Sequence, residues 1–412
     1  MLDRFYSPQI TLGHLRCGPI GAHIDGFADL LLRQGYATST ARCKIQLVAD
    51  LSAWLGHRRL GVKALEDGQI EKFMEARKRQ RRLQRGDQRT LAQLLNHLRQ
   101  AGTIAIPPIA IRESPLDRVI RDYIEFLIYQ RGLSQATIKN YAPVARGLLE
   151  TRFGTGKLRL DKLRVADVSD FIFHASSTVS PRRVQLTTGA LRSFLGFLTQ
   201  EGMTTANLAA SVPTVSNWRL SELPQFLETA QVEKLLRSCN RHSPSGRRDY
   251  AVLLLMARLG LRAGEIVHLN LENINWAAGE VLIRGKSARE DRLPLLPDVG
   301  QALAVYLKRD RPACSCRRVF IRMTAPHQGF SSPVAVCDIF RRALVRAHLH
   351  LPKKGSHLLR RSLATKMLRH GASLAQIGEV LRHQLAQTTE IYAKVDLGRL
   401  RDLAQPWPGG AR

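Results

Sequence analysis

Apolar residues recur at helical spacing in two long stretches of the N-terminal half of the chain. Residues 27–55 and 123–151 both carry apolar side chains three and four positions apart, broken by glycine and by the serine or threonine residues that often start helices. The two stretches also match each other, with Gly35 corresponding to Gly132. This pattern predicts two small, all-helical modules of similar fold.

The match continues to the end of each module. Asp67 and Asp167 each precede an apolar helix, and each module closes on an apolar helix followed by a glycine, Gly102 in the first and Gly202 in the second. The repeat therefore spans the whole unit, although the two copies need not be equally functional.

Two proline-containing segments divide the chain. The prolines of residues 106–115 and 211–224 forbid a continuous helix, which predicts a linker in each. Beyond residue 223, short helical patterns surround a pair of strands near 280–295, so the expected fold class is mainly α with a small β-sheet (α+β). The predicted divisions are an N-terminal tail (1–20), an additional helical module (21–105), a second helical module (113–204), a mixed domain (223–405) and a C-terminal tail (406–412).

The composition of the chain indicates what kind of partner it binds. The chain has 412 residues, enough for two to three domains, and 63 Lys and Arg residues against 34 Asp and Glu give it a formal net charge of +29. A protein this basic repels itself unless it works beside a polyanion, so nucleic acid is the first candidate partner. A membrane is not expected, because the longest apolar run, Tyr250–Ala257, is much shorter than the ~20 residues of a spanning helix.

The six cysteines are scattered and do not have the spacing of a disulfide framework. The first ten residues also lack the apolar core of a signal peptide, so a reducing cytoplasm is the expected location. Cys314 and Cys316 would make half of a zinc site, but no second pair of Cys or His ligands accompanies them. No metal and no other cofactor are therefore expected.

One arginine stands at a predicted helix start. In residues 257–269 an apolar helix ends at Gly260, a typical C-cap, and a new helix begins near Ala263. Arg262 therefore lies at a helix N-terminus, where the dipole and free N–H groups favour an anion, and it is well placed to hold a phosphate. Glu265, in the first turn of the same helix, either orients the site or is simply an acid stabilised by the helix dipole.

A second group of chemistry-bearing residues follows near the C-terminus. His357 and Arg360 are three positions apart on one face of a predicted helix. With 13 histidines and 63 Lys and Arg in 412 residues, about two such pairs arise by chance, so the pair gains value only from its context. A short helix follows over 373–383 and ends at His383, and Tyr392 comes nine residues later.

A lysine stands at the turn between the two predicted strands. Lys286 lies in a Gly-Lys-Ser that superficially matches the end of a phosphate-binding P-loop. The first glycine of that motif should fall at position 280, which is Glu280, and the intervening Val281–Ile283 suits a strand. We instead expect Gly285 to turn one strand back on the next, with Lys286 at the turn.

Taken in order, these residues resemble the catalytic pattern of the tyrosine recombinases, the Xer-like and phage or transposon integrase family. The family pattern is Arg, Lys, His-x-x-Arg, His or Trp, and Tyr, and the surrounding segments "LGLRAGEI", "HLLRRSLAT" and "LRHQLAQTTEIYAKV" also fit. The resemblance covers about residues 115–404. The matching residues are Arg262, Lys286, His357, Arg360, His383 and Tyr392.

The resemblance implies a fold of two SAM-like helical core-binding-type modules followed by a tyrosine-recombinase catalytic domain. The second module would be the core-binding domain, and its DNA contacts would include Thr137, Lys139, Arg182 and Arg183. The first module has no counterpart in the two-domain members of the family, and whether it contacts DNA or another subunit stays open. Its basic run, residues 77–89, suits either a solvated helix face or a stripe of phosphate contacts.

The resemblance also implies a reaction. Tyr392 would attack a DNA phosphate, form a 3′-phosphotyrosine and release a 5′-hydroxyl, so that neither ATP nor a metal ion is needed. Arg262 and Arg360 would hold the non-bridging oxygens of the phosphate and neutralise the charge that develops in the transition state.

The other members of the set have supporting tasks in this family. A phenol has a pKa of ~10, so a nearby base or positive field must help to remove its proton, and His357 is better placed than His383 to take or return it. Both histidines would hydrogen-bond to the phosphate, and Lys286 would protonate the leaving 5′-oxygen. Arg361 stands where many relatives have a second histidine, and no loss of activity is expected from it.

These observations predict a site-specific DNA recombinase, an integrase or transposase of a mobile element. It would act on two double-stranded DNA sites as a homotetramer, or together with related recombinases, in the bacterial cytoplasm. Two other classes share its features: a type IB topoisomerase, which relaxes DNA without choosing a site, and a non-catalytic DNA-binding partner of a recombinase complex. The intact set of six argues against the second. The C-terminal segment, residues 397–404, either closes over its own domain or packs into a neighbouring subunit.

Overall fold

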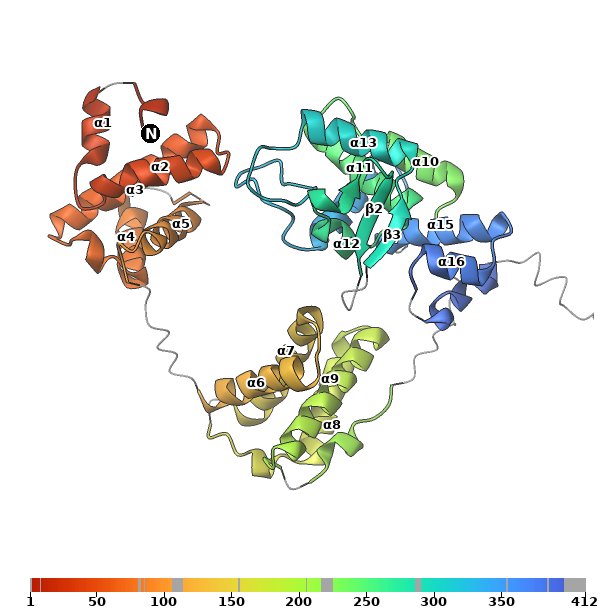
Figure 1. The fold of residues 1–412 in the computed structure, drawn as a ribbon. Coiled ribbons are helices and arrows are strands. Elements are labelled where there is room, and N and C mark those ends of the chain that lie inside the picture. Colours follow the sequence, from red (N-terminus) through yellow and green to blue (C-terminus); the bar gives the residue numbers. More distant parts are fainter. Residues whose placement is uncertain are drawn as a thin grey trace, which may run out of the picture. The chain divides into compact units, whose positions relative to one another are not determined.

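The computed structural model of the chain describes residues 2–7, 9–80, 83–84, 86–105, 114–154, 156–204, 206–215, 225–285, 290–352, 355–383 and 385–395. The chain divides into two compact units, one made of Met1–Pro107 with Leu223–Arg412 and the other of Pro108–Glu222. Most elements are helices, and the described residues contain a single sheet, of three strands in the order β1-β2-β3 (Figure 1). The predicted fold class, mainly α with a small β-sheet, is confirmed.

The N-terminal module packs its helices around one apolar core that includes Phe27, Ile45 and Leu94. A 3₁₀ turn, η1 (Leu2–Arg4), and a short helix, α1 (Gln9–Arg16), open the module. The helices predicted from periodicity follow, and they are α2 (Gly21–Arg33), α3 (Thr38–His57), α4 (Asp67–Gln80) and α5 (Asp87–Gln100).

The described residues between 2 and 20 do not form a tail, in contrast to the prediction. Leu2, Leu12 and Leu15 are buried in the core of the module. The Leu2 N–H also donates a hydrogen bond to Asp25 Oδ1 of α2 (3.1 Å). The prediction failed because two leucines in an eight-residue helix make too short a pattern to register as periodic.

The second module has its own apolar core, in which the Tyr123 and Phe194 rings pack edge to face with centroids 5.0 Å apart. The predicted linker 106–115 ends earlier than expected, because Pro115 is the first residue of a helix, a position that suits proline. The elements are α6 (Pro115–Glu125), a π-helical turn η3 (Phe126–Gln130), α7 (Gln135–Phe153), α8 (Val165–Thr178), α9 (Pro181–Gln200) and η5 (Leu208–Ser211).

The backbone supports the internal repeat. The glycines that the alignment pairs all have positive φ, at 76° for Gly35 and 58° for Gly132, and at 68° for Gly102 and 67° for Gly202. This conformation favours glycine, so the same turn recurs at the same place in each module. The closing helices differ in length, however, since α9 has 20 residues and α5 has 14.

The C-terminal domain surrounds the small sheet with helices (Figure 1). The predicted strand pair is confirmed, with Val281 opposite Leu293 and Arg284 opposite Glu290, whereas the two-residue strand β1 was too short to predict. The strands are β1 (Ile274–Asn275), β2 (Glu280–Arg284) and β3 (Glu290–Pro294). The helices are α10 (Thr229–Arg237), α11 (Pro244–Arg258), α12 (Ala263–His268), α13 (Pro297–Arg309), α14 (Val334–Arg346), α15 (His357–Arg369) and α16 (Leu374–Val380). The predicted segment 397–404 and tail 406–412 lie outside the described residues.

Candidate active site

Arg262 lies at the start of a helix, as predicted. Gly260, with φ of 59°, separates α11 from α12, and Arg262 immediately precedes the first residue of α12. Glycine suits this corner because a β-carbon at position 260 would come within 2.7 Å of the Leu381 side chain. The Arg262 N–H donates to Glu265 Oε2 (2.8 Å), and its Nη1 donates to Oε1 of the same carboxylate (2.7 Å). Glu265 therefore holds both the main chain and the guanidinium of Arg262.

Arg360 is buried on α15 and points at the same corner. It is 4% exposed, and its Nη1 donates to the Gly260 carbonyl (2.6 Å) while its Nη2 donates to the Leu381 carbonyl. Burial, and then the positive charges of Arg262 and Arg382, lower the pKa of Arg360 to about 9. Because burial and the neighbouring cations disfavour the charged form of this guanidinium, a nearby anion would stabilise it.

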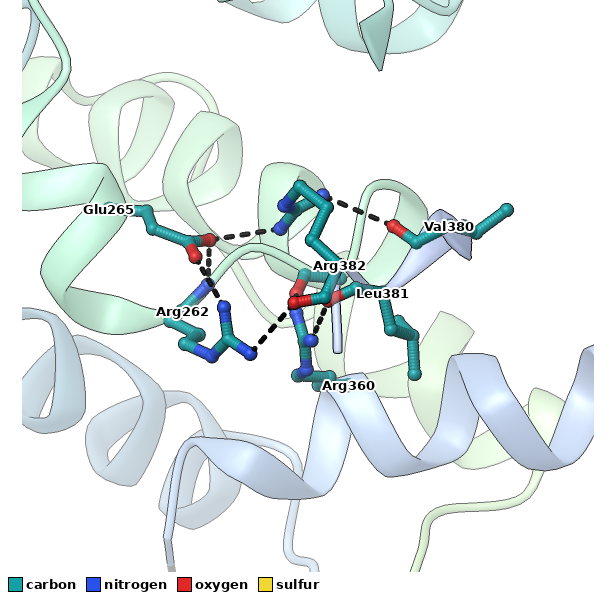
Figure 2. Close-up of polar contacts among 7 residues, drawn as sticks. Arg262, Glu265, Arg360, Val380, Leu381 and Arg382 are labelled. Atoms are coloured by element: carbon teal, nitrogen blue, oxygen red, sulfur yellow. Dashed lines mark hydrogen bonds and ion pairs between the residues drawn. The ribbon is translucent and has the colours of Figure 1, made fainter. Parts of the chain in front are cut away.

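The turn at the C-terminal end of α16 provides main-chain hydrogen-bond acceptors for these arginines (Figure 2). The Leu381 carbonyl accepts from Arg360, the Arg382 carbonyl accepts from Arg262 (3.4 Å), and the Val380 carbonyl accepts from Arg382 Nη1 (3.2 Å). Carbonyl groups left free at a helix C-terminus are natural partners for cations. The turn depends on Arg382, whose φ of 55° is left-handed and costs a non-glycine residue about 1 kcal/mol.

Arg382 is a second buried guanidinium beside Arg360, and it was not among the predicted site residues. Its Nη2 donates to Glu265 Oε2 (2.9 Å), with the two side chains 4% and 6% exposed. Burial alone would raise the pKa of Glu265, but Arg382 and Arg262 lower it below its usual value, so the carboxylate is ionised at neutral pH. The guanidiniums of Arg262 and Arg382 thus share one carboxylate. The only sequence signal for Arg382 was its place directly before His383.

His383 follows this turn and lies against Tyr392. The two rings are nearly parallel, at 9°, with centroids 6.5 Å apart, and His383 Nδ1 is 2.7 Å from Thr389 Oγ1. Burial, and then the charges of the three guanidiniums, lower the pKa of His383 to about 4. The ring is therefore neutral at pH 7 and has one N–H group to donate.

Tyr392 is buried, at 4% exposure, in the short helical segment η9 (Glu390–Val395). Burial raises the pKa of its phenol, and the positive charges of Arg360, Arg361 and Arg262 act in the opposite direction. The phenol therefore lies within the electrostatic reach of both predicted arginines. Arg361, the neighbour of Arg360 in the sequence, adds to the same field.

The two remaining members of the predicted set are His357 and Lys286. His357 is the first residue of α15 and is exposed, whereas Arg360, one turn later, is buried. The two side chains predicted to share a helix face therefore differ in burial. Lys286 lies outside the described residues, although the strands on either side of it pair as far as Arg284 and Glu290.

The predicted DNA contacts of the second module lie at two neighbouring helix starts. Thr137 and Lys139 are among the first five residues of α7, and Arg182 and Arg183 are in the first turn of α9. Arg183 Nη1 donates to Asn140 Oδ1 (3.4 Å), which joins the two starts. Lys139, Arg182 and Arg183 are exposed, so this face presents cations to solvent.

Part of the basic run in the first module has internal partners. Arg77 Nη1 is 2.7 Å from Asp50 Oδ2, and its Nε is 3.6 Å from Asp87 Oδ2. Neither predicted explanation of the run fits Arg77, which instead ties α4 to α3 and to the start of α5. Lys78 and Arg79 end α4 on the surface, so they suit either explanation.

Across the described ranges, no group of three or more His, Cys, Asp or Glu side chains could hold a metal ion. Cys314 Sγ lies 4.0 Å from the Cys316 carbonyl. No helix in the described part of the chain combines the length and apolar character needed to cross a bilayer.

Comparison with known proteins gives the family. Residues 225–399 match the phage integrase family, and residues 120–202 match the phage integrase N-terminal SAM-like domain. The chain is 43% identical over 410 residues to the putative integrase/recombinase y4rA of Sinorhizobium fredii, covering 99% of both proteins. It is 30% identical over 293 residues to the tyrosine recombinase XerD of Listeria monocytogenes, covering 70% of this chain and 97% of that protein. The chain therefore belongs to the phage integrase family of tyrosine recombinases.

Solved structures share the fold at low sequence identity. XerH recombinase in a post-cleavage complex with its palindromic difH substrate has a TM-score of 0.56 at 18% identity, covering 73% of this chain and 99% of that one. A lambda integrase dimer bound to a COC′ core site has a TM-score of 0.53 at 15% identity, covering 80% and 91%. The predicted SAM-like module and tyrosine-recombinase fold are confirmed, and the match to y4rA extends through the first module.

Proposed function

We propose that this chain is a site-specific recombinase that cuts and rejoins DNA through a covalent bond between Tyr392 and a 3′-phosphate. The observation that carries the proposal is the imbalance of charge around the tyrosine. The guanidiniums of Arg262 and Arg382 share a single carboxylate, Glu265, beside the neutral ring of His383. A third guanidinium, that of Arg360, donates to main-chain carbonyls of the same site. Such a site is complementary to a phosphate, and more so to its transition state, which carries additional negative charge.

In the proposed reaction, the Tyr392 oxygen attacks the phosphorus of a DNA phosphodiester and the bond to the 5′-oxygen breaks. Arg262 and Arg360 hold the non-bridging oxygens, because guanidinium donors match the geometry of a phosphate. His383 adds a hydrogen bond without adding charge. The energy of the diester is kept in the phosphotyrosine, so a 5′-hydroxyl of another strand can reverse the attack and rejoin the DNA.

Two protons move in this reaction. The phenol proton must leave against the effect of burial, and His357, at the exposed start of α15, is the proposed acceptor. Lys286 is the proposed donor of the proton that the leaving 5′-oxygen receives. Glu265 stays ionised and orients Arg262, which favours the first of the two roles considered for it.

Double-stranded DNA is the proposed partner, in keeping with the net charge of +29 and the exposed cations at the starts of α7 and α9. Among the solved structures of similar fold is a lambda integrase tetramer bound to a Holliday junction. We extend that assembly to this chain, as a homotetramer or a mixture with related recombinases on two DNA sites. Relatives named integrase/recombinase support a role as the integrase or transposase of a mobile element.

A nicked suicide substrate tests this function. Full-length protein is incubated with duplexes taken from the DNA that flanks its gene, each nicked so that the cleaved strand diffuses away. Wild-type protein should form a covalent adduct that survives denaturation, and Tyr392→Phe should form none because it lacks the attacking oxygen. An adduct with Tyr392→Phe, or none with wild type on any flanking site, contradicts the proposal. Plasmid relaxation without strand exchange would instead favour a type IB topoisomerase.

A further inference from the structure

Arg382 connects three parts of the site. Its side chain joins α12 by donating from Nη2 to Glu265, and it closes on its own turn by donating from Nη1 to Val380. Its main-chain carbonyl accepts from Arg262. Its Nη2 pairs with Glu265, and its Nε has no hydrogen-bond partner among the described residues.

The turn that Arg382 occupies aims two carbonyl groups at the predicted arginines. The Leu381 carbonyl accepts from Arg360 and the Arg382 carbonyl from Arg262, so a shift of the turn would move both guanidiniums (Figure 2). The left-handed conformation of Arg382 sets the direction of these groups. The ion pair with Glu265 is the side-chain contact that fixes the turn against α12.

We propose that Arg382 is a positioning residue for DNA cleavage. Its ion pair with Glu265 locks the turn after α16, and the locked turn holds Arg262 and Arg360 where they grip the scissile phosphate. The inference rests on the proposed function of those two arginines, and it does not require Arg382 to touch DNA.

Arginine suits this task better than the alternatives. Its planar group donates in two fixed directions, here to Glu265 and to Val380, whereas a lysine offers a single charged nitrogen. Glycine would relieve the left-handed backbone but would remove the ion pair. We therefore expect cleavage rates to fall in the order wild type, Arg382→Lys, and then Arg382→Gln together with Arg382→Gly.

The decisive experiment compares two substrates built on the site at which wild-type protein forms its adduct. One has a normal scissile phosphate, and the other has a methylphosphonate, in which a methyl group replaces one non-bridging oxygen and removes the charge that the arginines neutralise. Arg382→Gln should slow adduct formation on the phosphate about 100-fold relative to wild type, because misplaced catalytic groups cost about that much. On the methylphosphonate the variant should stay within about 3-fold of wild type, because correctly placed arginines matter less there.

Arg247→Gln is the matched control. Arg247 pairs with Asp310, whose side chain is 4% exposed, so its loss also breaks an internal ion pair of the same domain. This variant should lower the unfolding temperature but change the two cleavage rates by the same factor. DNA affinity, measured on uncleavable duplex, should match wild type in both variants.

The outcomes separate the inference from the function on which it rests. If wild type forms no adduct, the proposed function fails. The positioning role is wrong if wild type is active but Arg382→Gln cleaves at the wild-type rate. It is also wrong if Arg382→Gln slows cleavage of both substrates by the same factor. If Arg382→Gln fails to fold, the same two substrates are tested with Arg382→Lys and Arg382→Gly. A loss confined to the phosphate substrate supports the role, and a wild-type rate for Arg382→Gly overturns it, since the turn alone would then suffice.

Discussion

Thr389 contacts the Nδ1 nitrogen of His383. Its hydroxyl is 2.7 Å from Nδ1 of His383, and the residue is 2% exposed. We infer that the hydroxyl donates to Nδ1, so that the neutral ring carries its own proton on Nε2. Because burial and the neighbouring guanidiniums hold the pKa near 4, the ring keeps this state at neutral pH. Thr389 thereby keeps His383 as a donor for the proposed phosphate.

Removal of this hydroxyl should weaken cleavage without removing a catalytic group. Thr389→Val keeps the size of the side chain but leaves the ring free to carry its proton on either nitrogen. We expect adduct formation to slow about 10-fold in single-turnover measurements. Thr389→Ser keeps the hydroxyl and should cleave within about 2-fold of wild type. If the two variants cleave at the same rate, the hydroxyl has no part in setting the tautomer.

Among individual residues, the sequence predicts those that occur in the order typical of the family's catalytic pattern. Four of the six residues in the predicted set lie in one cluster with Glu265. Arg382 and Thr389 escaped prediction because they act through a turn carbonyl and a buried hydroxyl. Contacts of that kind arise from the packing of α12, α16 and the segment after it, and they leave no periodic pattern in the sequence.

Among the elements, the β2–β3 hairpin is proposed to supply the leaving-group proton. Its strands pair up to Arg284 and Glu290, on either side of Lys286. Lys286→Ala removes the proposed acid, so cleavage of normal DNA should slow by about 10² to 10⁴. A substrate with sulfur at the 5′-bridging position has a leaving group that needs no proton, and there the variant should stay within about 10-fold of wild type. The measurement is the rate of adduct formation. If Lys286→Ala slows it by the same factor on both substrates, Lys286 is not the proton donor.

The long helices could be predicted because amphipathic periodicity is strong over three or more turns. The same method missed α1 and β1, which have eight and two residues. It also missed a difference between the two modules. Relative to the paired glycines, α9 starts earlier than α5, and the additional residues carry Arg182 and Arg183. Among its described residues, the first module has no counterpart of the helical extension that presents this arginine pair, and the repeat in the sequence did not reveal this difference.

For the whole molecule, the positive charge is spread over every part. Lys and Arg outnumber Asp and Glu by 17 to 9 in residues 1–107, by 15 to 10 in residues 108–222 and by 31 to 15 in residues 223–412. The first module is thus more basic than the second, although the part of it that the structure describes has no counterpart of the α9 extension. A DNA contact of the first module would have to use other cations, and Lys78 and Arg79 are exposed at the end of α4.

Salt dependence of DNA binding distinguishes the two roles considered for the first module. Each phosphate contact contributes about 0.9 to the slope of log affinity against log salt concentration. The double substitution of Lys78 and Arg79 by glutamine should therefore reduce the slope by about 1 to 2 if both contact phosphate. The same change at Arg182 and Arg183 should reduce it by about as much, and affinity should be measured on duplex DNA at several salt concentrations.

A substitution of Lys308 and Arg309 by glutamine controls for the loss of charge itself, because these cations are also exposed in the last turn of a helix. We expect the control to leave the slope unchanged and both module variants to lower it, since long-range attraction alone is screened within about 10 Å at 0.1 M salt. A first-module variant that keeps the wild-type slope but weakens the pairing of two DNA sites would place its cations against a neighbouring subunit. Contact with DNA and contact with a subunit thus change different measurements, and the same full-length proteins decide between them.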